Sequence, residues 1–409
     1  MSLAETYRGL RVIDLSANIA GPLACMILGD LGADVIKIEP PDTGEATRAL
    51  PPRWDPESER DGGWESTVFL TLNRNKRSAA LDIRTGAGRD AVLRIVRDAD
   101  VVVESFRPGV ADRLGLGFDD LSQASPRLVH CSVNAFGDGP LGHDRPGYDA
   151  LIQAFTGIME MTGDPDGEPA RAAPSVVDIS TGLWAAISIT AALARRAAEP
   201  GPQRLSASLV DSGFFLLCHQ VMGYLGSGGF PSRLGSAAPS TAPYEAFRTA
   251  DGTIMIAAAT DRLFARLCQA LEMPELAADP RFRTVADRVA TRSELAEVMA
   301  ARLRAETAQT WLARIAAAGV PAGPVNDLAG ALAHPLTAER AIIRAAAPGR
   351  IPALKQVRLP IDTGADCIMS QPPALGEHTA EILAEAGFSA DEISGFGPSV
   401  TAEGKAEPR

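Results

Sequence analysis

The stretch LRVIDLSANIAGPLACMILGDLGADVIKIE, residues 10–39, holds two β-rich segments on either side of a helical one. Residues 10–16 and 33–39 are short apolar runs rich in Val and Ile, which is typical of strands buried on both faces. Residues 22–32 between them are apolar at helical spacing. This pattern predicts two parallel strands joined by a crossover helix.

The same alternation continues along the chain. Further strands are predicted at residues 78–83, 100–106, 128–136 and 204–211, with helical patterns at 86–99 and 181–197. The fold class is therefore α/β, with an open, mostly parallel, Rossmann-like sheet. We assign residues 1–200 and 331–409 to a large α/β domain, 201–226 to a linker and 227–330 to a smaller α+β domain.

Composition narrows the function classes. The 409 residues carry a formal charge of −12, which argues against nucleic acid or an anionic membrane as a partner. Five cysteines without a CxxC pair and five histidines without ligand spacing predict reduced thiols, no metal site and a cytoplasmic location. We expect no signal peptide, and the apolar run at 182–194 is too short to span a bilayer.

Nucleotide and hydrolase motifs are absent from the sequence. The turn after the first strand reads DLSANIAGP, without the G-x-G-x-x-G spacing, and no Walker A sequence occurs. The segment LVDSG at 209–213 lacks the G-x-S-x-G form of a nucleophile elbow. These observations disfavour a dehydrogenase, a P-loop enzyme and a serine hydrolase.

One acidic residue, Asp178, stands in the apolar segment AAPSVVDISTGLWAA at 172–186. Pro174 precedes it and helix-forming residues follow, so Asp178 suits a helix cap or first turn. The same position suits a reactive carboxylate, because a helix amino end stabilises negative charge. The pattern alone leaves both interpretations open.

Two basic stretches, residues 72–84 and 104–115, follow predicted strands. One interpretation is a solvated charged face. The other is a phosphate site, since arginine binds phosphate oxygens in a bidentate way and ligands dock at the carboxyl ends of parallel strands. The side chains concerned are Arg74, Lys76, Arg77, Arg84, Arg107 and Arg113.

Taken together and in order, several segments resemble the class III (family III) CoA-transferases over residues 8–397. They include LGADVIKIEPP, NKRSAALDIR, DVVVESFRPGVADRLGLG, RPGYDALIQAFTGIMEMTGDP, DISTG, GVPAGPVND and LGEHTAEIL. The resemblance implies CoA transfer from an acyl-CoA thioester to a small carboxylic acid, with coenzyme A as substrate and no tightly bound cofactor. It also implies a homodimer of interlocked chains.

The resemblance implies that Asp178 is the catalytic nucleophile, which passes through an aspartyl anhydride and an aspartyl-CoA thioester. It places CoA contacts at Leu81, Arg84, Ser105, Phe106, Arg107, Arg113, Tyr148 and Asp149. Three departures argue against formate or oxalate as natural substrates: Ile19 replaces a family glutamine, Pro40 replaces a basic residue, and SAAPS at 236–240 replaces a glycine tetrad. A dicarboxylate such as succinate, mesaconate or itaconate is a hypothesis.

Two other functions remain as alternatives. In the racemase branch of this family a histidine stands where this chain has Tyr148, and tyrosine, with an ordinary pKa of about 10, is a poor base near neutral pH. The nearby His143 could replace it only through an unusual loop geometry. A catalytically silent CoA-binding protein is disfavoured because Asp178 and its STG surroundings are present.

Overall fold

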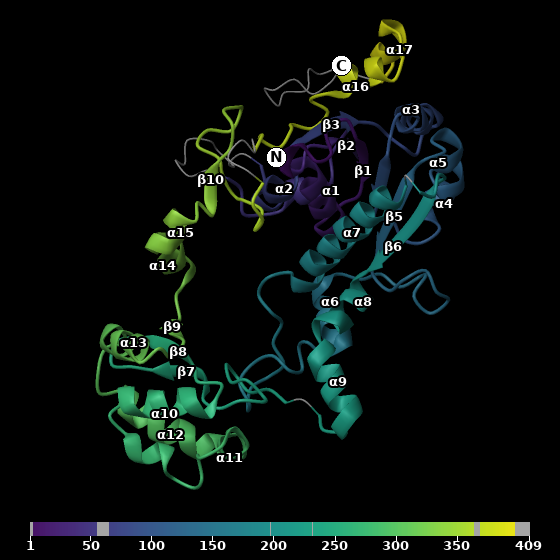
Figure 1. The fold of residues 1–409 in the computed structure, drawn as a ribbon. Coiled ribbons are helices and arrows are strands. Elements are labelled where there is room, and N and C mark those ends of the chain that lie inside the picture. The colour runs from purple at the N-terminus through teal and green to yellow at the C-terminus, as the bar shows by residue number, and fades with distance from the viewer. Residues whose placement is uncertain (1–2, 55–64, 197, 231, 364–368, 397–409) are drawn as a thin grey trace. The chain divides into compact units, whose positions relative to one another are not determined.

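The computed structural model describes residues 3–54, 65–196, 198–230, 232–363 and 369–396. The chain divides into two compact units (Figure 1). The first unit contains Met1–Thr156, Ala173–Cys218 and Ala341–Arg409, and the second contains Gly157–Ala172 and His219–Arg340. Each unit is described separately below.

The first unit is built on a six-stranded sheet in the order β3-β2-β1-β4-β5-β6, and all neighbouring strands run parallel. The prediction of an α/β fold with a parallel sheet is confirmed. Strand order reverses between β1 and β4, which is where α/β sheets usually bind ligands. The strands are β1 Arg11–Leu15, β2 Asp34–Glu39, β3 Lys76–Ala80, β4 Val101–Glu104, β5 Val129–Asn134 and β6 Gln203–Ser208.

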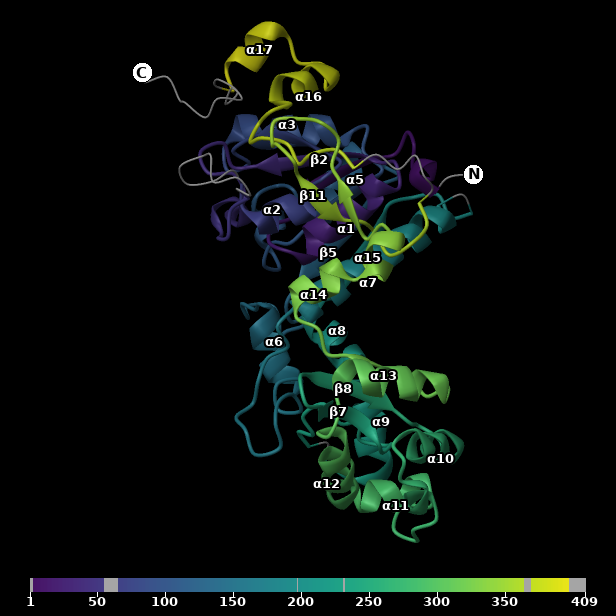
Figure 2. The same ribbon diagram turned by 90° about the vertical axis from the view of Figure 1, so that its left-hand side faces the viewer.

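Helices cover both faces of this sheet. On one face, α1 (Ala20–Asp30) packs against the long helix α7 (Val176–Arg195). On the other face, apolar side chains of α3 (Gly86–Val96), α5 (Phe118–Ala124) and α16 (Thr379–Glu385) share one core with β1, β2 and β4. Figure 2 shows α16 beside α3. The remaining helices and strands of this unit are α2 Thr67–Leu72, α4 Val110–Arg113, α6 Asp149–Thr156, α8 Leu209–Leu216, α17 Ala390–Ser394, β10 Ile343–Ala345 and β11 Lys355–Val357.

The C-terminal segment returns to the large unit and protects the edge strand β3. The backbone N–H of His378 donates to the carbonyl of Ser78 at 2.9 Å, and the Thr379 hydroxyl accepts from the Ala80 N–H at 3.0 Å. The Gly376 N–H donates to the Ser78 hydroxyl at 2.9 Å. The LGEHTA sequence therefore satisfies polar groups that an edge strand would otherwise expose.

The predicted linker at 201–226 is wrong as a description of local structure. This segment contains β6, whose six residues all pair with β5. It then contains α8 and most of α9 (Cys218–Ser227). The reason is that β6 lies at the sheet edge, where polar side chains such as Arg204 and Ser206 are exposed, so it lacks the apolar run of the central strands.

The second unit is a small α+β structure, as predicted, but it also recruits Gly157–Ala172 from before α7. An antiparallel sheet of β7 (Tyr244–Arg248), β8 (Thr253–Ala257) and β9 (Ala322–Pro324) packs with helices around buried Phe264, Phe282 and Trp311. The helices are α10 Asp261–Ala270, α11 Val285–Ala290, α12 Arg292–Leu303, α13 Ala308–Ala317, α14 Leu328–Ala333 and α15 Pro335–Glu339.

Helix α7 is longer than the apolar run in the sequence suggested. An 18-residue window of this 20-residue helix has a mean hydropathy of 1.6, so length and composition alone would allow it to cross a membrane. One face of α7 is nevertheless buried in the large unit, through Val177, Thr181, Gly182, Ala185, Ala186, Ile189 and Ala192. A core helix of a sheet protein gives the same hydropathy signal.

Candidate active site

A cavity of about 200 Å³ lies at the carboxyl edge of the central sheet, at the point where strand order reverses. The turn after β1, the loops after β4 and β5, and the amino end of α7 all contribute to its wall. Its lining residues are Ala17, Asn18, Ile19, Ala20, Gly21, Ser105, Phe106, Arg107, Pro108, Val133, Asn134, Ala135, Arg145, Pro146, Gly147, Tyr148, Asp178 and Leu209.

Asp178 lies in the first turn of α7 and faces this cavity. Its carboxylate forms no hydrogen bond or ion pair with any other residue that the structure describes. Burial, and secondly the negative charge of Asp149, raise the pKa of Asp178 to about 7. A half-buried carboxylate without a partner suits a reactive group, and the capping interpretation of Asp178 does not fit this arrangement.

The capping role belongs to Asp149 instead. Asp149 is 4% exposed, and its Oδ1 atom accepts hydrogen bonds from the backbone N–H groups of Val177 at 2.9 Å and Asp178 at 3.3 Å. The Gln153 amide donates to the other carboxylate oxygen at 2.6 Å. The structure thus places the Asp149 side chain on the amino end of α7, away from the cavity lining where the resemblance had implied a CoA contact.

The remaining residues expected to bind CoA fall into two groups. Ser105, Phe106, Arg107 and Tyr148 line the cavity together with Asp178. Leu81, Arg84 and Arg113 do not line it. Leu81 is 2% exposed and belongs to the sheet core, Arg84 is exposed and paired with Asp82 at 2.8 Å, and Arg113 lies in α4 near the loop after β4.

Three of the six basic residues considered for phosphate binding already form ion pairs within the fold. Arg74 pairs with Asp30 at 2.7 Å, Lys76 with Asp14 at 2.8 Å and Arg77 with Asp34 at 2.6 Å. All three start or precede β3, at the amino edge of the sheet. The phosphate interpretation therefore does not fit Arg74, Lys76 and Arg77, because each already has a carboxylate partner, buried for Arg74 and Lys76 and half-buried for Arg77.

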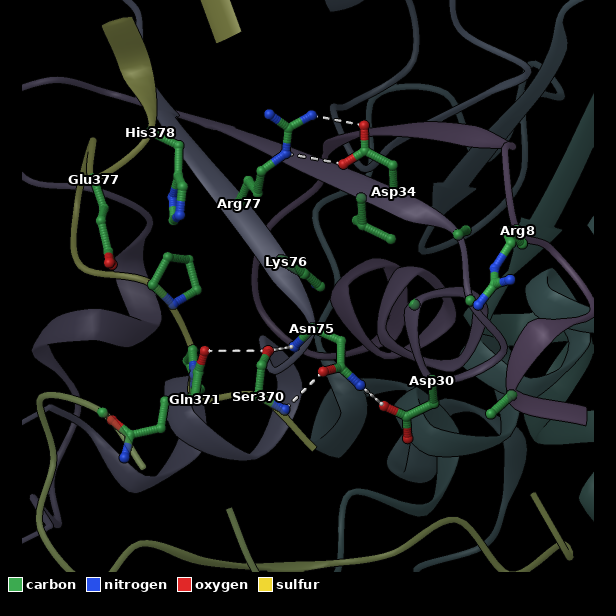
Figure 3. Close-up of a pocket in the computed structure, with 18 of the residues that line it drawn as sticks. Arg8, Asp30, Asp34, Asn75, Lys76, Arg77, Ser370, Gln371, Glu377 and His378 are labelled. Atoms are coloured by element: carbon green, nitrogen blue, oxygen red, sulfur yellow. Dashed lines mark hydrogen bonds and ion pairs between the residues drawn. The ribbon is translucent and has the colours of Figure 1, made fainter. Parts of the chain in front are cut away.

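A larger cavity, of about 940 Å³, lies at that amino edge (Figure 3). Arg77 and Asp34 form an ion pair in its wall, and Asn75 bridges Asp30 and Ser370 through its side chain. Its ionic side chains mostly satisfy one another. The smaller cavity at the carboxyl edge contains the unpartnered carboxylate, so we identify the smaller one as the candidate active site.

Two cations line the small cavity together with Asp178, and sequence reasoning singled out only one of them. Arg107 and Arg145 both line the cavity, and neither forms an ion pair with a described residue. The Arg145 guanidinium lies 4.4 Å from the ring centroid of Phe136 and 5.3 Å from that of Phe155. Arg145 stands within the RPGYDA segment, so its place in a shared motif was the available signal.

His143 and Asp178 line different cavities of the large unit. Tyr148 lines the Asp178 cavity with 69% of its surface exposed, whereas His143 lines a different cavity beyond Pro108. The Nδ1 atom of His143 lies 3.1 Å from the carboxylate of Asp144. A second base suited to racemisation is therefore not placed beside Asp178.

Outside the undescribed segments, no group of three or more His, Cys, Asp or Glu side chains is placed to hold a metal ion. Four cysteines are free thiols: Cys25, Cys131 and Cys268 are buried and Cys218 is exposed. Cys367 lies outside the described residues.

Comparison with known proteins defines the class. The model of CoA-transferase family III matches residues 7–379, and the chain belongs to this family of acyl-CoA:carboxylate CoA-transferases. It is 38% identical to a succinate–glutarate CoA-transferase of Agrobacterium fabrum over 92% of this chain and 94% of that protein. It is 39% identical to an acetyl-CoA:oxalate CoA-transferase of Acetobacter aceti over 82% and 84%, respectively.

The fold of a solved family member is similar to the fold of this chain. The crystal structure of a CaiB/BaiF family protein from Brucella suis superposes with a TM-score of 0.80, at 39% identity, and covers 93% of this chain and 98% of that one. The family resemblance inferred from the motifs is thus confirmed.

Proposed function

We propose that this chain transfers CoA from an acyl-CoA to a free carboxylic acid through covalent intermediates on Asp178. One observation carries the proposal: a half-buried carboxylate without a partner stands at a helix amino end, in a cavity with Ser105, Phe106 and Arg107. An ionised carboxylate freed of hydrogen-bond partners is a nucleophile, and its exchange for another carboxylate is close to thermoneutral.

Each step in this scheme exchanges one acyl bond for another. An oxygen of Asp178 attacks the thioester carbonyl, so that a C–O bond forms, the C–S bond breaks, and a mixed anhydride and CoA thiolate result. The thiolate then attacks the Asp178 carbonyl carbon, which releases the donor acid as its carboxylate and leaves an aspartyl-CoA thioester. The acceptor carboxylate repeats both steps in reverse order. No net proton or electron is transferred.

The protein supports this chemistry through position and environment. Asp149 fixes the first turn of α7 and so the direction of the Asp178 side chain. Burial of Asp178 removes the water that would stabilise its charge, which makes the ionised form more reactive. The same exclusion of water protects the anhydride from hydrolysis.

We further propose that the exchanged acids are dicarboxylic. Succinate, glutarate and oxalate appear in the names of the related transferases, and each carries a second carboxylate. Arg107 and Arg145 are cations without an ion pair to a described residue at the cavity. Guanidinium groups of this kind suit either a distal carboxylate or a CoA phosphate.

A homodimer is part of the proposal, and an exposed apolar surface supports it. This surface lies on α6, α7 and α8 of the large unit and is formed by Leu151, Phe155, Ile179, Leu183, Trp184, Ile187, Phe214 and Phe215. Apolar side chains gathered in this way normally mark a protein interface. Sedimentation equilibrium should give twice the chain mass of 42.9 kDa, and a dimer of interlocked chains should resist dissociation on dilution.

A cytoplasmic location, without nucleic-acid or membrane partners, completes the proposal. The free thiols of Cys25, Cys131, Cys218 and Cys268 support a reducing compartment, and the charge of −12 opposes binding to polyanions. Fractionation of cells that express the chain would place it in the soluble cytoplasmic fraction. Recovery with membranes would contradict this part.

The activity test is a CoA-exchange screen. Succinyl-CoA is offered with glutarate, mesaconate, itaconate or oxalate, and succinyl-CoA with acetate serves as the monocarboxylate control. Exchange should require Asp178, so Asp178→Ala should lower kcat by at least about a thousandfold. Quenched wild-type protein should carry a hydroxylamine-labile adduct on the Asp178 peptide.

Three results would count against this function. Full turnover by Asp178→Ala would show that Asp178 is not the nucleophile. Uptake of solvent deuterium at the α-carbon without exchange would establish the racemase instead. Binding of CoA with neither reaction would indicate a silent binding protein.

A further inference from the structure

Two buried lysines from neighbouring strands share one carboxylate beneath the candidate active site. Lys37 of β2 and Lys76 of β3 both have fully buried side chains, as does Asp14 of β1. The Asp14 Oδ2 atom lies 2.8 Å from Nζ of Lys76 and 3.6 Å from Nζ of Lys37. Glu45 lies 3.0 Å from Lys37 on its other side.

Each lysine also hydrogen-bonds one end of the same turn, and Lys76 donates in addition to Oδ1 of Asn73 at 2.8 Å. Nζ of Lys37 donates to the carbonyl oxygen of Ser16 at 2.9 Å. Nζ of Lys76 donates to the carbonyl oxygen of Pro22 at 2.9 Å. Residues 17–21 between these two carbonyls all line the cavity that contains Asp178. The lysines therefore fix the start and the end of one cavity wall.

Further hydrogen bonds restrain the backbone of this turn. Asp14 accepts hydrogen bonds from the backbone N–H of Ser16 at 2.9 Å and from its hydroxyl. The Ser105 hydroxyl accepts from the Ala17 N–H at 2.9 Å, which ties the turn to the loop after β4. Asn18 has a φ of +66°, so the backbone is held in the left-handed region at the middle of the turn.

Stability alone does not account for this arrangement. Buried charges carry a large desolvation penalty, and well-packed apolar side chains often stabilise a core as much or more. The charged groups around Lys37 also include Glu39 and Arg48, which pair with each other at 2.7 Å. The lysines fix the positions of the Ser16 and Pro22 carbonyl groups by hydrogen bonds, which apolar side chains could not form.

We infer that Lys37 and Lys76, joined through Asp14, are positioning residues that hold the β1–α1 turn against the reacting carboxylate. The inference rests on the proposed function for its kinetic consequence. Neither lysine touches the cavity where Asp178 reacts, so they act through the backbone at residues 16–22. A misplaced wall would slow the chemical step more than it would weaken binding of CoA.

The test compares Lys37→Met with Arg74→Met. Arg74 is as deeply buried, at 2% exposure, and its loss breaks the pair with Asp30, but it does not contact residues 16–22. Both variants should lower the melting temperature. Only Lys37→Met should lower kcat for CoA exchange, by about tenfold or more, while KM for acyl-CoA changes less than about threefold.

Hydrogen–deuterium exchange of the same two variants gives a readout that does not need activity. The amides of Ser16 and Ala17 should exchange faster, relative to those of strand β1, in Lys37→Met and not in Arg74→Met. Unchanged exchange at these amides would overturn the inference. Equal loss of kcat in both variants would also overturn it, since the effect would then be general destabilisation.

A milder variant covers the case in which Lys37→Met does not fold. Ser16→Ala keeps every buried charge and removes only the hydroxyl contact with Asp14. It should also speed exchange at Ala17, and protection equal to the wild type would count against the inference. If the wild type transfers no CoA, the proposed function fails and the exchange data alone decide the role of the lysines.

Discussion

The Oδ1 atom of Asp149 lies 3.3 Å from the backbone nitrogen of Asp178, so one carboxylate fixes the helix turn that carries the other. Burial raises the pKa of Asp178, and the proximity of Asp149 raises it further, because ionising Asp178 places a second negative charge beside Asp149. Asp149 thus fixes the position of the proposed nucleophile and contributes to the pH at which it becomes charged.

The rate of CoA transfer should follow the ionisation of Asp178. Only the carboxylate form attacks a thioester, so kcat/KM should rise with pH through an apparent pKa of about 7. In Asp149→Asn the neighbouring charge is gone, while the amide oxygen can still accept from the Val177 N–H. The profile of this variant should therefore move to lower pH. The measurement is kcat/KM between pH 5 and 9.

A conservative change elsewhere in the large unit provides the control for that profile. Asp90 pairs with Arg89 on the exposed side of α3, and Asp90→Asn should leave the pH profile unchanged. If Asp149→Asn also retains the wild-type profile, Asp149 does not tune Asp178.

Removing the charge of Asp178 should stabilise the fold at alkaline pH. Its pKa rises from an ordinary 3.8 to about 7 on folding, so between these values the folded state binds more protons than the unfolded state. Stability therefore falls as pH rises from about 4 to 7, by about 1.4 kcal/mol for each unit of pKa difference, and stays lower above pH 7.

The variant Asp178→Asn avoids this loss. It should unfold at a higher temperature than the wild type at pH 8, and the advantage should shrink towards pH 4. Thermal unfolding across this range is the measurement. An Asp178→Asn protein that is less stable than the wild type at pH 8 would show that the carboxylate has a stabilising partner.

Parallel strands could be predicted from sequence because each central strand is a continuous apolar run, as in Val101–Glu104. The edge strand β6 was recognised as β-rich but assigned to a linker, since its exposed Arg204 and Ser206 resemble loop residues. The discontinuous second unit could not be predicted, because no local pattern in residues 157–172 shows with which core they pack.

The ion-pair partners of the basic residues also could not be predicted from the sequence. Arg74, Lys76 and Arg77 form a basic stretch in the sequence, but their carboxylate partners lie 43 to 62 positions away. Asp178 was singled out with two possible roles, and only the position of Asp149 decides between them. Such pairings depend on the register of neighbouring strands, which a single sequence does not specify.

Arg107 should contribute mainly to binding of acyl-CoA. It lines the cavity and has no ion pair with a described residue, so its charge is available to a phosphate or carboxylate. A hydrogen bond to a charged group contributes about 1.5–3 kcal/mol, so Arg107→Ala should raise KM for acyl-CoA about 10- to 100-fold. The increase should be smaller at high salt, where such pairs are screened.

Arg8 supplies the matched control for this change. It is an exposed arginine at the opposite edge of the sheet, where it pairs with Glu5 at 2.6 Å (Figure 3). Steady-state kinetics of Arg8→Ala should match those of the wild type. A KM that is unaltered in Arg107→Ala would place the CoA phosphates away from this loop.

Gly182 should tolerate no side chain, because α1 and α7 meet there. A methyl group at this position would lie 2.7 Å from the carbonyl oxygen of Ala20 and 3.1 Å from a methyl carbon of Leu23. Helix α1 would have to move, and its first turn lines the Asp178 cavity. Overpacking of this kind costs about 1–3 kcal/mol. We therefore expect Gly182→Ala to lower both the denaturant midpoint and kcat.

Gly86→Ala separates that clash from the general effect of replacing a helical glycine. Gly86 begins α3 on the other face of the sheet, and nothing lies within 4 Å of where its methyl group would be. Alanine should be neutral or slightly stabilising there, since it restricts the unfolded chain. If Gly182→Ala behaves like Gly86→Ala in denaturant unfolding and in CoA exchange, the packing of α1 on α7 does not set the position of the wall that faces Asp178.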